Sequence, residues 1–145
     1  MINFGLEFHH FGLAARRLSD AMSFVSGLGY TVGDRVFDPE QNVTLSLCRH
    51  VSMPAIEIIC PSGTAGPIDK YLAHHPDGLI YHLCYEAEDL KASLRILEAA
   101  NLRVICVAEP RPAVLFGGRL VSFYNVVGVG LIELLEPAGE RLTAA

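Results

Sequence analysis

Hydrophobic and polar positions follow one order along the first half of the chain, and the same order returns in the second half. In each half a short apolar run precedes one segment of helical periodicity, and three further apolar runs follow it. The predicted strands cover residues 7–14, 30–37, 43–48, 55–60, 79–87, 103–108, 119–124 and 129–135. The predicted helices begin at Ser19-Asp20 and at Glu88, and end near Gly27 and Ala100. The pattern in each half of the chain therefore predicts secondary-structure elements in the order βαβββ.

An internal repeat supports this division. An offset of 72 residues places His10 on His82, and the same offset aligns Leu18 with Leu90. We expect an α+β fold in which residues 1–145 form a single domain of two βαβββ modules, at about 6–66 and 78–137. Two such modules can pair into a cup-shaped, curved sheet, and a concave sheet is where ligands usually bind. A loop over 61–67 and a short helix over 68–75 are expected between the modules.

Composition narrows the class of protein. The chain of 145 residues is 51% hydrophobic and 19% charged, which provides a core and excludes intrinsic disorder. A net charge of −5 without a basic run argues against nucleic acid as a partner. Neither a membrane span nor a signal peptide is expected. Four cysteines without a CxxC pair are expected to be buried, reduced thiols, which suits a cytoplasmic protein.

The histidines that carry the repeat are candidates for chemistry. His9 and His10 are adjacent on a predicted strand, so their side chains should point to opposite faces. The repeat selects His10, because His82 occupies the equivalent position and Tyr81 matches His9. Two equivalent histidines would meet where the modules pair. The alternative is a pair of structural histidines, each hydrogen-bonded within the sheet.

Two glutamates add a second signal. Glu57 and Glu133 each lie within the apolar last strand of a module, where a carboxylate is costly unless it is paired, protonated or bound to metal. An edge strand with the glutamate facing water is the alternative. Together with His10 and His82 they give two nitrogen and two oxygen ligands, which suit one divalent ion such as Co, Ni, Mn, Zn or Mg. Such an ion can polarise a carbonyl group or stabilise an enolate.

These segments resemble the vicinal oxygen chelate superfamily, which contains glyoxalases, bleomycin resistance proteins and dioxygenases. The resemblance runs from His9-His10-Phe-Gly-Leu through Ile56-Glu57-Ile and Tyr81-His82-Leu to Ile132-Glu133-Leu, and covers about residues 6–137. It implies the vicinal oxygen chelate fold and a metal site at His10, Glu57, His82 and Glu133. It also implies a homodimer, which this superfamily often forms.

Within the superfamily, the segment Glu40-Gln-Asn42-Val is similar to the acid/base segment of methylmalonyl-CoA epimerases. This resemblance puts Glu40 in the role of an acid/base residue, and the alternative is a solvated turn residue after Asp38-Pro39. We expect Glu133 to be the second acid/base residue as well as a metal ligand. Asn42 departs from the pattern, which has glycine there, and loops near 114–118 and 124–127 lack the histidines of those epimerases. The resemblance therefore supports the metal site more strongly than it supports the identity of the substrate.

The expected function is that of a metal-dependent isomerase or epimerase, which enolises a small carbonyl substrate such as a CoA thioester. A lyase like glyoxalase I uses the same machinery and stays open as an alternative, although no glutathione site is evident. A dioxygenase usually has three protein ligands, which the presence of both Glu57 and Glu133 disfavours. A resistance-type or other non-enzymatic binding protein would lack the ligand set.

Overall fold

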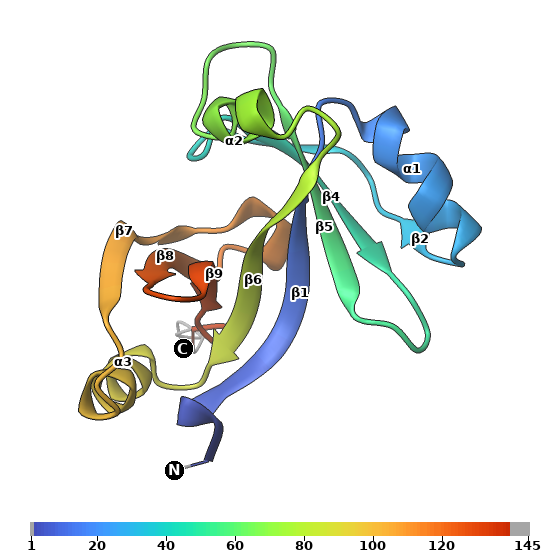
Figure 1. The fold of residues 1–145 in the computed structure, drawn as a ribbon. Coiled ribbons are helices and arrows are strands. Elements are labelled where there is room, and N and C mark those ends of the chain that lie inside the picture. The colour runs from blue at the N-terminus through green and yellow to red at the C-terminus, as the bar shows by residue number, and fades with distance from the viewer. Residues whose placement is uncertain (1, 140–145) are drawn as a thin grey trace, which may run out of the picture. The chain divides into compact units, whose positions relative to one another are not determined.

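The computed structural model describes residues 2–139 of the chain, which contain nine strands, three α-helices and two short 3-10 helices (Figure 1). The chain divides into two compact units. One comprises residues 9–83, and the other comprises residues 1–8 together with 84–145. Strands β1 (Leu6–Ala14) and β6 (Leu79–Ala87) each pass from one unit into the other.

The unit of residues 9–83 contains the first βαβββ module and the connection that follows it. After β1 come α1 (Leu18–Gly27), β2 (Thr31–Val32), β3 (Val36–Asp38), β4 (Val43–Arg49), β5 (Ala55–Pro61) and α2 (Asp69–His74). The strand order is β2-β4-β5-β1, with β3 also paired to β4. β5 is antiparallel to β4 and parallel to β1.

In this unit, α1 covers one face of the strands. Leu18 and Val25 of α1 are buried and pack with Cys48, Ile58 and other apolar residues of the sheet. Side chains alternate along a strand, so the residues between these core positions lie on the opposite face. That face contains His10 of β1 and Glu57 of β5, and its geometry is described below.

The second unit contains the other module. It contains residues 6–8 of β1 and residues 84–87 of β6. Its other elements are η1 (Ile2–Gly5), α3 (Leu90–Ala99), β7 (Val104–Pro112), η2 (Val114–Phe116), β8 (Leu120–Val126) and β9 (Gly130–Leu135). The strand order is β6-β9-β8-β7. Asp89 caps α3 by accepting a hydrogen bond from the backbone N–H of Ala92. Leu90 and Leu94 of α3 pack on Ile132 and Leu134 of β9.

The expected α+β class and the order βαβββ in each module are confirmed, but two strands differ in detail. Residues 30–37 form two short strands, because residues 33–35 lie opposite residues 46–47 of β4 and insert one extra residue. In addition, β7 does not end near residue 108 as predicted, but continues through Pro110 and Pro112. β7 pairs with β8 alone, and an edge strand tolerates proline because half of its N–H groups need no strand partner.

The cysteines also differ in part from expectation. All four are free thiols, and Cys48, Cys60 and Cys84 are buried as expected. The expectation is wrong for Cys106, which is exposed because it lies on the edge strand β7. Burial raises the pKa of the Cys48 and Cys60 thiols, so both stay protonated at neutral pH.

The sequence predicts no membrane-spanning segment. Among residues 2–139, every helix is too short or too polar to cross a bilayer.

Candidate metal centre

The pairing of β1 with β5 places a histidine and a glutamate on the same face of the sheet. His10 pairs with Ala55 and Gly12 pairs with Glu57, in parallel register. Two residues apart on a strand, His10 and Gly12 share one face, and their partners lie on that face too. This face is opposite to the one that α1 covers. The register therefore brings the imidazole of His10 toward the carboxylate of Glu57.

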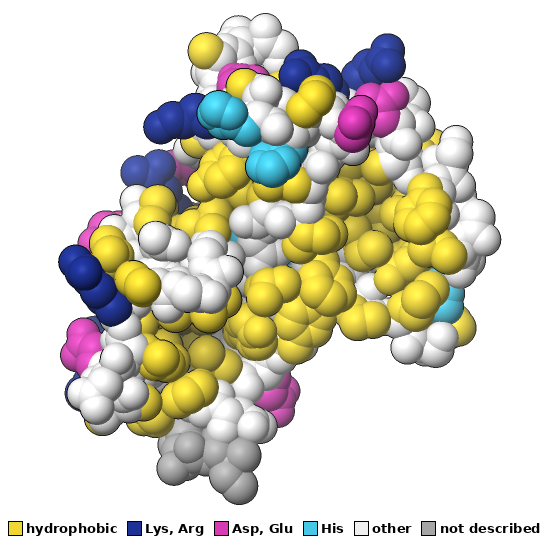
Figure 2. All heavy atoms as spheres, viewed as in Figure 1, with side chains coloured by type: hydrophobic (Ala, Val, Ile, Leu, Met, Phe, Trp, Pro, Cys, Tyr) yellow, Lys and Arg dark blue, Asp and Glu magenta, His cyan; other side chains and the backbone are white. Residues whose placement is uncertain are grey.

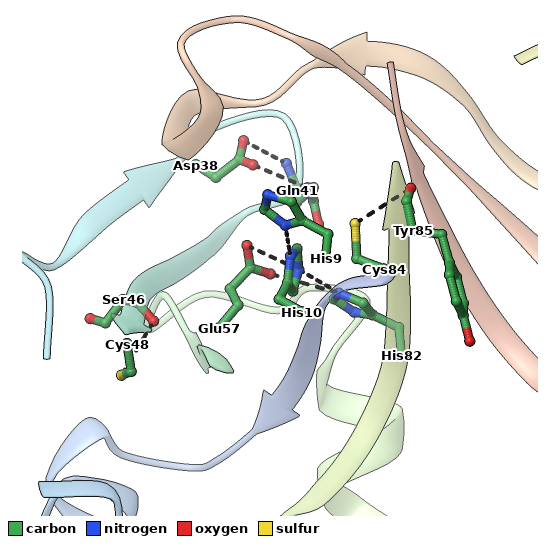
Figure 3. Close-up of polar contacts among 10 residues, drawn as sticks. All are labelled: His9, His10, Asp38, Gln41, Ser46, Cys48, Glu57, His82, Cys84 and Tyr85. Carbon is green, nitrogen blue, oxygen red and sulfur yellow. Dashed lines mark hydrogen bonds and ion pairs between the residues drawn. The ribbon is translucent and has the colours of Figure 1, made fainter. Parts of the chain in front are cut away.

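A second histidine joins them from β6. His82 Nε2 lies 3.4 Å from His10 Nε2 and 3.8 Å from Glu57 Oε1, while His10 Nε2 lies 3.8 Å from Glu57 Oε2 (Figure 3). All three side chains are buried, with exposed fractions of 0% for His10, 4% for Glu57 and 2% for His82. The two imidazoles and the carboxylate thus point their polar atoms at one another in a water-poor place.

These distances fit a metal ion. Two ligands that each lie about 2.1 Å from an ion are about 3.0–3.4 Å apart in octahedral or tetrahedral geometry. The two Nε2 atoms are 3.4 Å apart and each lies 3.8 Å from one carboxylate oxygen of Glu57, so a small inward movement would bring these donors to bonding distance. A buried carboxylate between two imidazoles also supplies the hard and borderline donors that divalent ions prefer. The donor set of His10, Glu57 and His82 therefore suits a divalent cation.

Gly12 provides the space that the His82 ring occupies. A Cβ atom built on Gly12 would overlap the ring atoms Cε1, Nδ1 and Nε2 of His82. The His82 ring also meets the Tyr81 ring edge-on, with centroids 4.7 Å apart, and the Tyr81 ring contacts the tilted ring of Tyr71 of α2 at 5.2 Å. The absence of a side chain at Gly12 and the aromatic neighbour together define where His82 lies.

Glu133, the fourth ligand expected from the sequence, belongs to the other unit. It lies on β9 opposite Phe123 of β8, and its exposed fraction is 2%. Its neighbours Ile132 and Leu134 pack on α3, so Glu133 is on the strand face that α3 does not cover. Glu57 has the same relation to α1 in its own unit. The two glutamates are thus structurally equivalent within their modules.

Glu40, the expected acid/base residue, lies in the exposed turn between β3 and β4. The buried carboxylate of Asp38 holds this turn, because its Oδ1 accepts hydrogen bonds from the backbone N–H groups of Glu40, at 2.9 Å, and Gln41, at 3.3 Å. Gln41 Nε2 donates to Asp38 Oδ2 at 3.2 Å. The backbone at Glu40 is therefore fixed while its side chain stays at the surface.

Asn42 explains one departure from the epimerase pattern. Its φ is +53°, in the left-handed region where the epimerase pattern has glycine and where asparagine is the best-tolerated substitute. Its side chain also bridges to the following loop, since Nδ2 donates to Ala65 O at 2.9 Å and Oδ1 accepts from Ser62 Oγ at 2.7 Å. Asparagine at this position therefore preserves the turn that presents Glu40.

Sequence reasoning set His9 aside, and the structure gives it a contact. His9 Nδ1 lies 2.7 Å from His10 Nδ1, and the two rings are nearly perpendicular, at 76°. Strand alternation places these side chains on opposite faces, but it does not describe how far an imidazole can turn back toward its neighbour. The adjacent histidines in the sequence were the available signal, and alternation alone led away from it.

Comparison with known proteins identifies the family. The model of the Glyoxalase/Bleomycin resistance protein/Dioxygenase superfamily matches residues 9–123. This chain belongs to that superfamily. The match spans the first module and most of the second, including His10, Glu57 and His82. This membership confirms the resemblance to the superfamily that the sequence motifs indicate.

Curated relatives within this superfamily are epimerases. The chain is 29% identical to "Methylmalonyl-CoA epimerase, mitochondrial" of Dictyostelium discoideum over 133 residues, or 90% of this chain and 78% of the relative. It is 33% identical to "Ethylmalonyl-CoA/methylmalonyl-CoA epimerase" of Cereibacter sphaeroides over 106 residues, or 71% of this chain and 77% of the relative. These relatives are enzymes of the isomerase class.

A solved structure shows the same fold. The crystal structure of methylmalonyl-CoA epimerase from Mycobacterium tuberculosis aligns with a TM-score of 0.73 at 23% identity, over 90% of this chain and 87% of that one. At this identity the likeness concerns the fold. It supports the vicinal oxygen chelate fold that the sequence predicts.

Proposed function

We propose that this protein is a metal-dependent epimerase that acts on the α-carbon of a small CoA thioester of the methylmalonyl or ethylmalonyl type. The observation that carries the proposal is the buried group of His10, Glu57 and His82 in a chain whose curated relatives are epimerases of such thioesters. The relatives favour this reaction over the lyase, dioxygenase and binding-protein alternatives.

The proposed ligand set is His10, Glu57, His82 and Glu133. The distances among the first three support their inclusion. Glu133 is included because it occupies in the second module the position that Glu57 occupies in the first, and because it is equally buried. Four protein ligands leave positions for a substrate oxygen on an octahedral ion such as Co, Ni, Mn or Mg, and Zn remains within the donor preferences.

The chemistry requires an acid and a base on opposite sides of the α-carbon. When bound, the ion would polarise the thioester carbonyl and so make the α-proton more acidic. One carboxylate takes that proton, and the electron pair of the C–H bond moves into the enolate. A second carboxyl group returns a proton to the opposite side, and the pair of transfers inverts the centre. We assign these two roles to Glu40 and Glu133.

The proposal extends to the setting of the enzyme. A reducing compartment, such as the cytoplasm, would keep the four free cysteines as thiols. We further propose that the enzyme is a homodimer.

Exchange of the α-proton with solvent tests the reaction. The protein, loaded with Co²⁺ in deuterated buffer, is expected to place deuterium at the α-carbon of methylmalonyl-CoA, as followed by mass spectrometry. His10→Ala should lose both metal and exchange. If the wild type holds metal yet exchanges no α-proton of methylmalonyl-CoA or ethylmalonyl-CoA, the proposed reaction is wrong while the metal centre stands.

The role of Glu40 is tested by Glu40→Gln, which keeps the size of the side chain and removes its titrating group. We expect metal content to stay the same and turnover to fall by about 10²-fold or more, the usual scale for general acid–base catalysis. Glu98→Gln is the matched control, because Glu98 lies on the exposed side of α3. Equal turnover in the two variants would remove Glu40 from the mechanism.

A further inference from the structure

The two ring nitrogens of His10 face different partners. Nε2 points to the group described above, at 3.8 Å from Glu57 Oε2 and 3.4 Å from His82 Nε2. Nδ1, on the other side of the ring, lies 2.7 Å from Nδ1 of His9 (Figure 3). This separation is at the short end of the range for a protein hydrogen bond that involves nitrogen. His9 therefore makes a hydrogen bond to the nitrogen of His10 that faces away from Glu57.

This contact limits where one proton can lie, because one of the two Nδ1 atoms must donate and the other accept. A neutral imidazole carries a single proton, and the nitrogen that binds a metal must be the bare one. If His10 carries its proton on Nδ1 and donates it to His9 Nδ1, then Nε2 presents its lone pair toward Glu57 and His82. His9 then keeps its own proton on Nε2. The reverse arrangement, with the proton on His10 Nε2, would block that atom as a ligand.

The second module holds its histidine in a different way. The residue before His82 is Tyr81, whose ring meets His82 edge-on, and Gly12 leaves the space for the ring. His82 is thus positioned by packing. The first module places a second imidazole at the corresponding position, so the repeat has diverged at the residue next to each candidate ligand.

We propose that His9 is a positioning residue of the metal centre, which fixes the tautomer and the ring orientation of His10 through the hydrogen bond between the two Nδ1 atoms. This inference rests on the proposed metal centre. Partners of this kind raise the basicity of the ligand, and their loss usually weakens metal binding by about 10–100-fold. His9 itself is not a ligand in this arrangement.

The first test needs no metal. In the metal-free protein with ¹⁵N-labelled histidine, NMR shifts report which ring nitrogen of each imidazole carries the proton. We expect His10 to carry it on Nδ1 in the wild type and to populate both tautomers in His9→Phe, which keeps a ring and removes its nitrogens. A wild type in which His10 carries its proton on Nε2 overturns the proposal, whatever the variants do.

The second test measures the dissociation constant for Co²⁺ by titration. His9→Phe should bind Co²⁺ about 10–100-fold more weakly than the wild type. His9→Asn should recover most of the affinity, because its Oδ1 can accept the same hydrogen bond. His74→Phe is the matched control, since His74 is exposed at the end of α2, and it should bind like the wild type.

The outcomes separate this inference from the proposed function. A wild type that binds no divalent ion would defeat the metal centre itself, and the NMR result would still decide the tautomer. A wild type that binds Co²⁺, together with folded His9→Phe protein of equal affinity, would show that the contact with His9 is merely structural. If His9→Phe does not fold, His9→Asn decides the question. A His9→Asn protein that loses the wild-type affinity for Co²⁺ or the wild-type tautomer of His10 would count against the inference.

Discussion

A residue without a side chain determines where one proposed metal ligand lies. His82 occupies the volume above Gly12 that any Cβ atom would take. Because interiors are close-packed, a single methyl group at such a place forces its neighbour to move. The His82 ring is the end of a side chain and can rotate away, so the cost of a methyl group at Gly12 should appear in metal binding more than in folding.

We therefore expect Gly12→Ala to fold and to bind Co²⁺ at least about 10-fold more weakly than the wild type, in line with the usual cost of disturbing a ligand's surroundings. Titration of the metal-free protein measures this. Gly27→Ala at the end of α1 is the control, because nothing lies within 4 Å of its added Cβ. A Gly12→Ala variant with wild-type affinity would contradict the positioning role.

The sequence predicts these residues to different degrees. His10 and His82 emerge because they repeat at equal positions, and Glu57 and Glu133 emerge because a carboxylate in an apolar strand is unusual. His9 and Gly12 have neither of these signals, and for His9 the only sign in the sequence is that it precedes His10. One depends on the rotation of a ring and the other on space left for a distant side chain, and neither is visible before the strands are paired.

At the scale of elements, the irregular strands have local causes. Gly33 donates its N–H to Leu47 O at 2.9 Å, and an added Cβ would collide with that oxygen. This close approach accommodates the extra residue that divides β2 from β3. Hydrophobic alternation over 30–37 correctly predicts extended chain, but the break arises from a backbone contact with β4, which the alternation does not contain.

The turn that precedes β4 offers a test of element geometry. Asn42→Ala should lower the free energy of unfolding by about 2 kcal/mol, because it loses side-chain hydrogen bonds and places a Cβ-bearing residue without a compensating amide at φ +53°. Asn42→Gly should lower the free energy of unfolding by only about 1 kcal/mol, since it loses the hydrogen bonds but relieves the backbone strain. Urea denaturation measures both. If glycine costs as much as alanine, the left-handed backbone is not the source of the loss.

At the scale of the whole molecule, the edge strands β2, β3 and β7 are poor templates for the addition of further strands. β2 and β3 are two and three residues long, and β7 has two register shifts and the prolines Pro110 and Pro112. Short, irregular and proline-bearing edges resist strand addition. A dimer of this protein should therefore form through side chains. Figure 2 shows hydrophobic side chains gathered where Figure 1 draws α1, β2 and β5.

We expect sedimentation to give twice the chain mass of 15.8 kDa, with the exposed face of α1 in the interface. Phe24 and Leu28, one turn apart, are 71% and 44% exposed, which is unusual for side chains of their size. Phe24→Arg should give a monomer. Val129→Arg, in the turn before β9, is the control because Val129 is similarly exposed, at 63%, but lies away from α1 in the sequence. A wild-type monomer, or a dimeric Phe24→Arg protein, would contradict this prediction.

The general architecture is the most predictable part of this protein. The repeat at 72 residues and the alternation within each half are enough to predict two βαβββ modules, because both are long-range regularities of the sequence. The exposure of Cys106 is not predictable in the same way. It depends on β7 being last in its strand order, which the local pattern of residues 103–108 does not reveal.

The anchored turn at Asp38 has a kinetic consequence. Since the backbone N–H groups of Glu40 and Gln41 are tied to a buried carboxylate, any repositioning of the Glu40 carboxyl group takes place within its own side chain and needs no movement of the turn. Enzymes that close a lid over the substrate wait for motions of microseconds to milliseconds. Proton delivery by Glu40 would then be independent of solvent viscosity, and thickening the medium with sucrose would slow only the arrival and departure of the thioester.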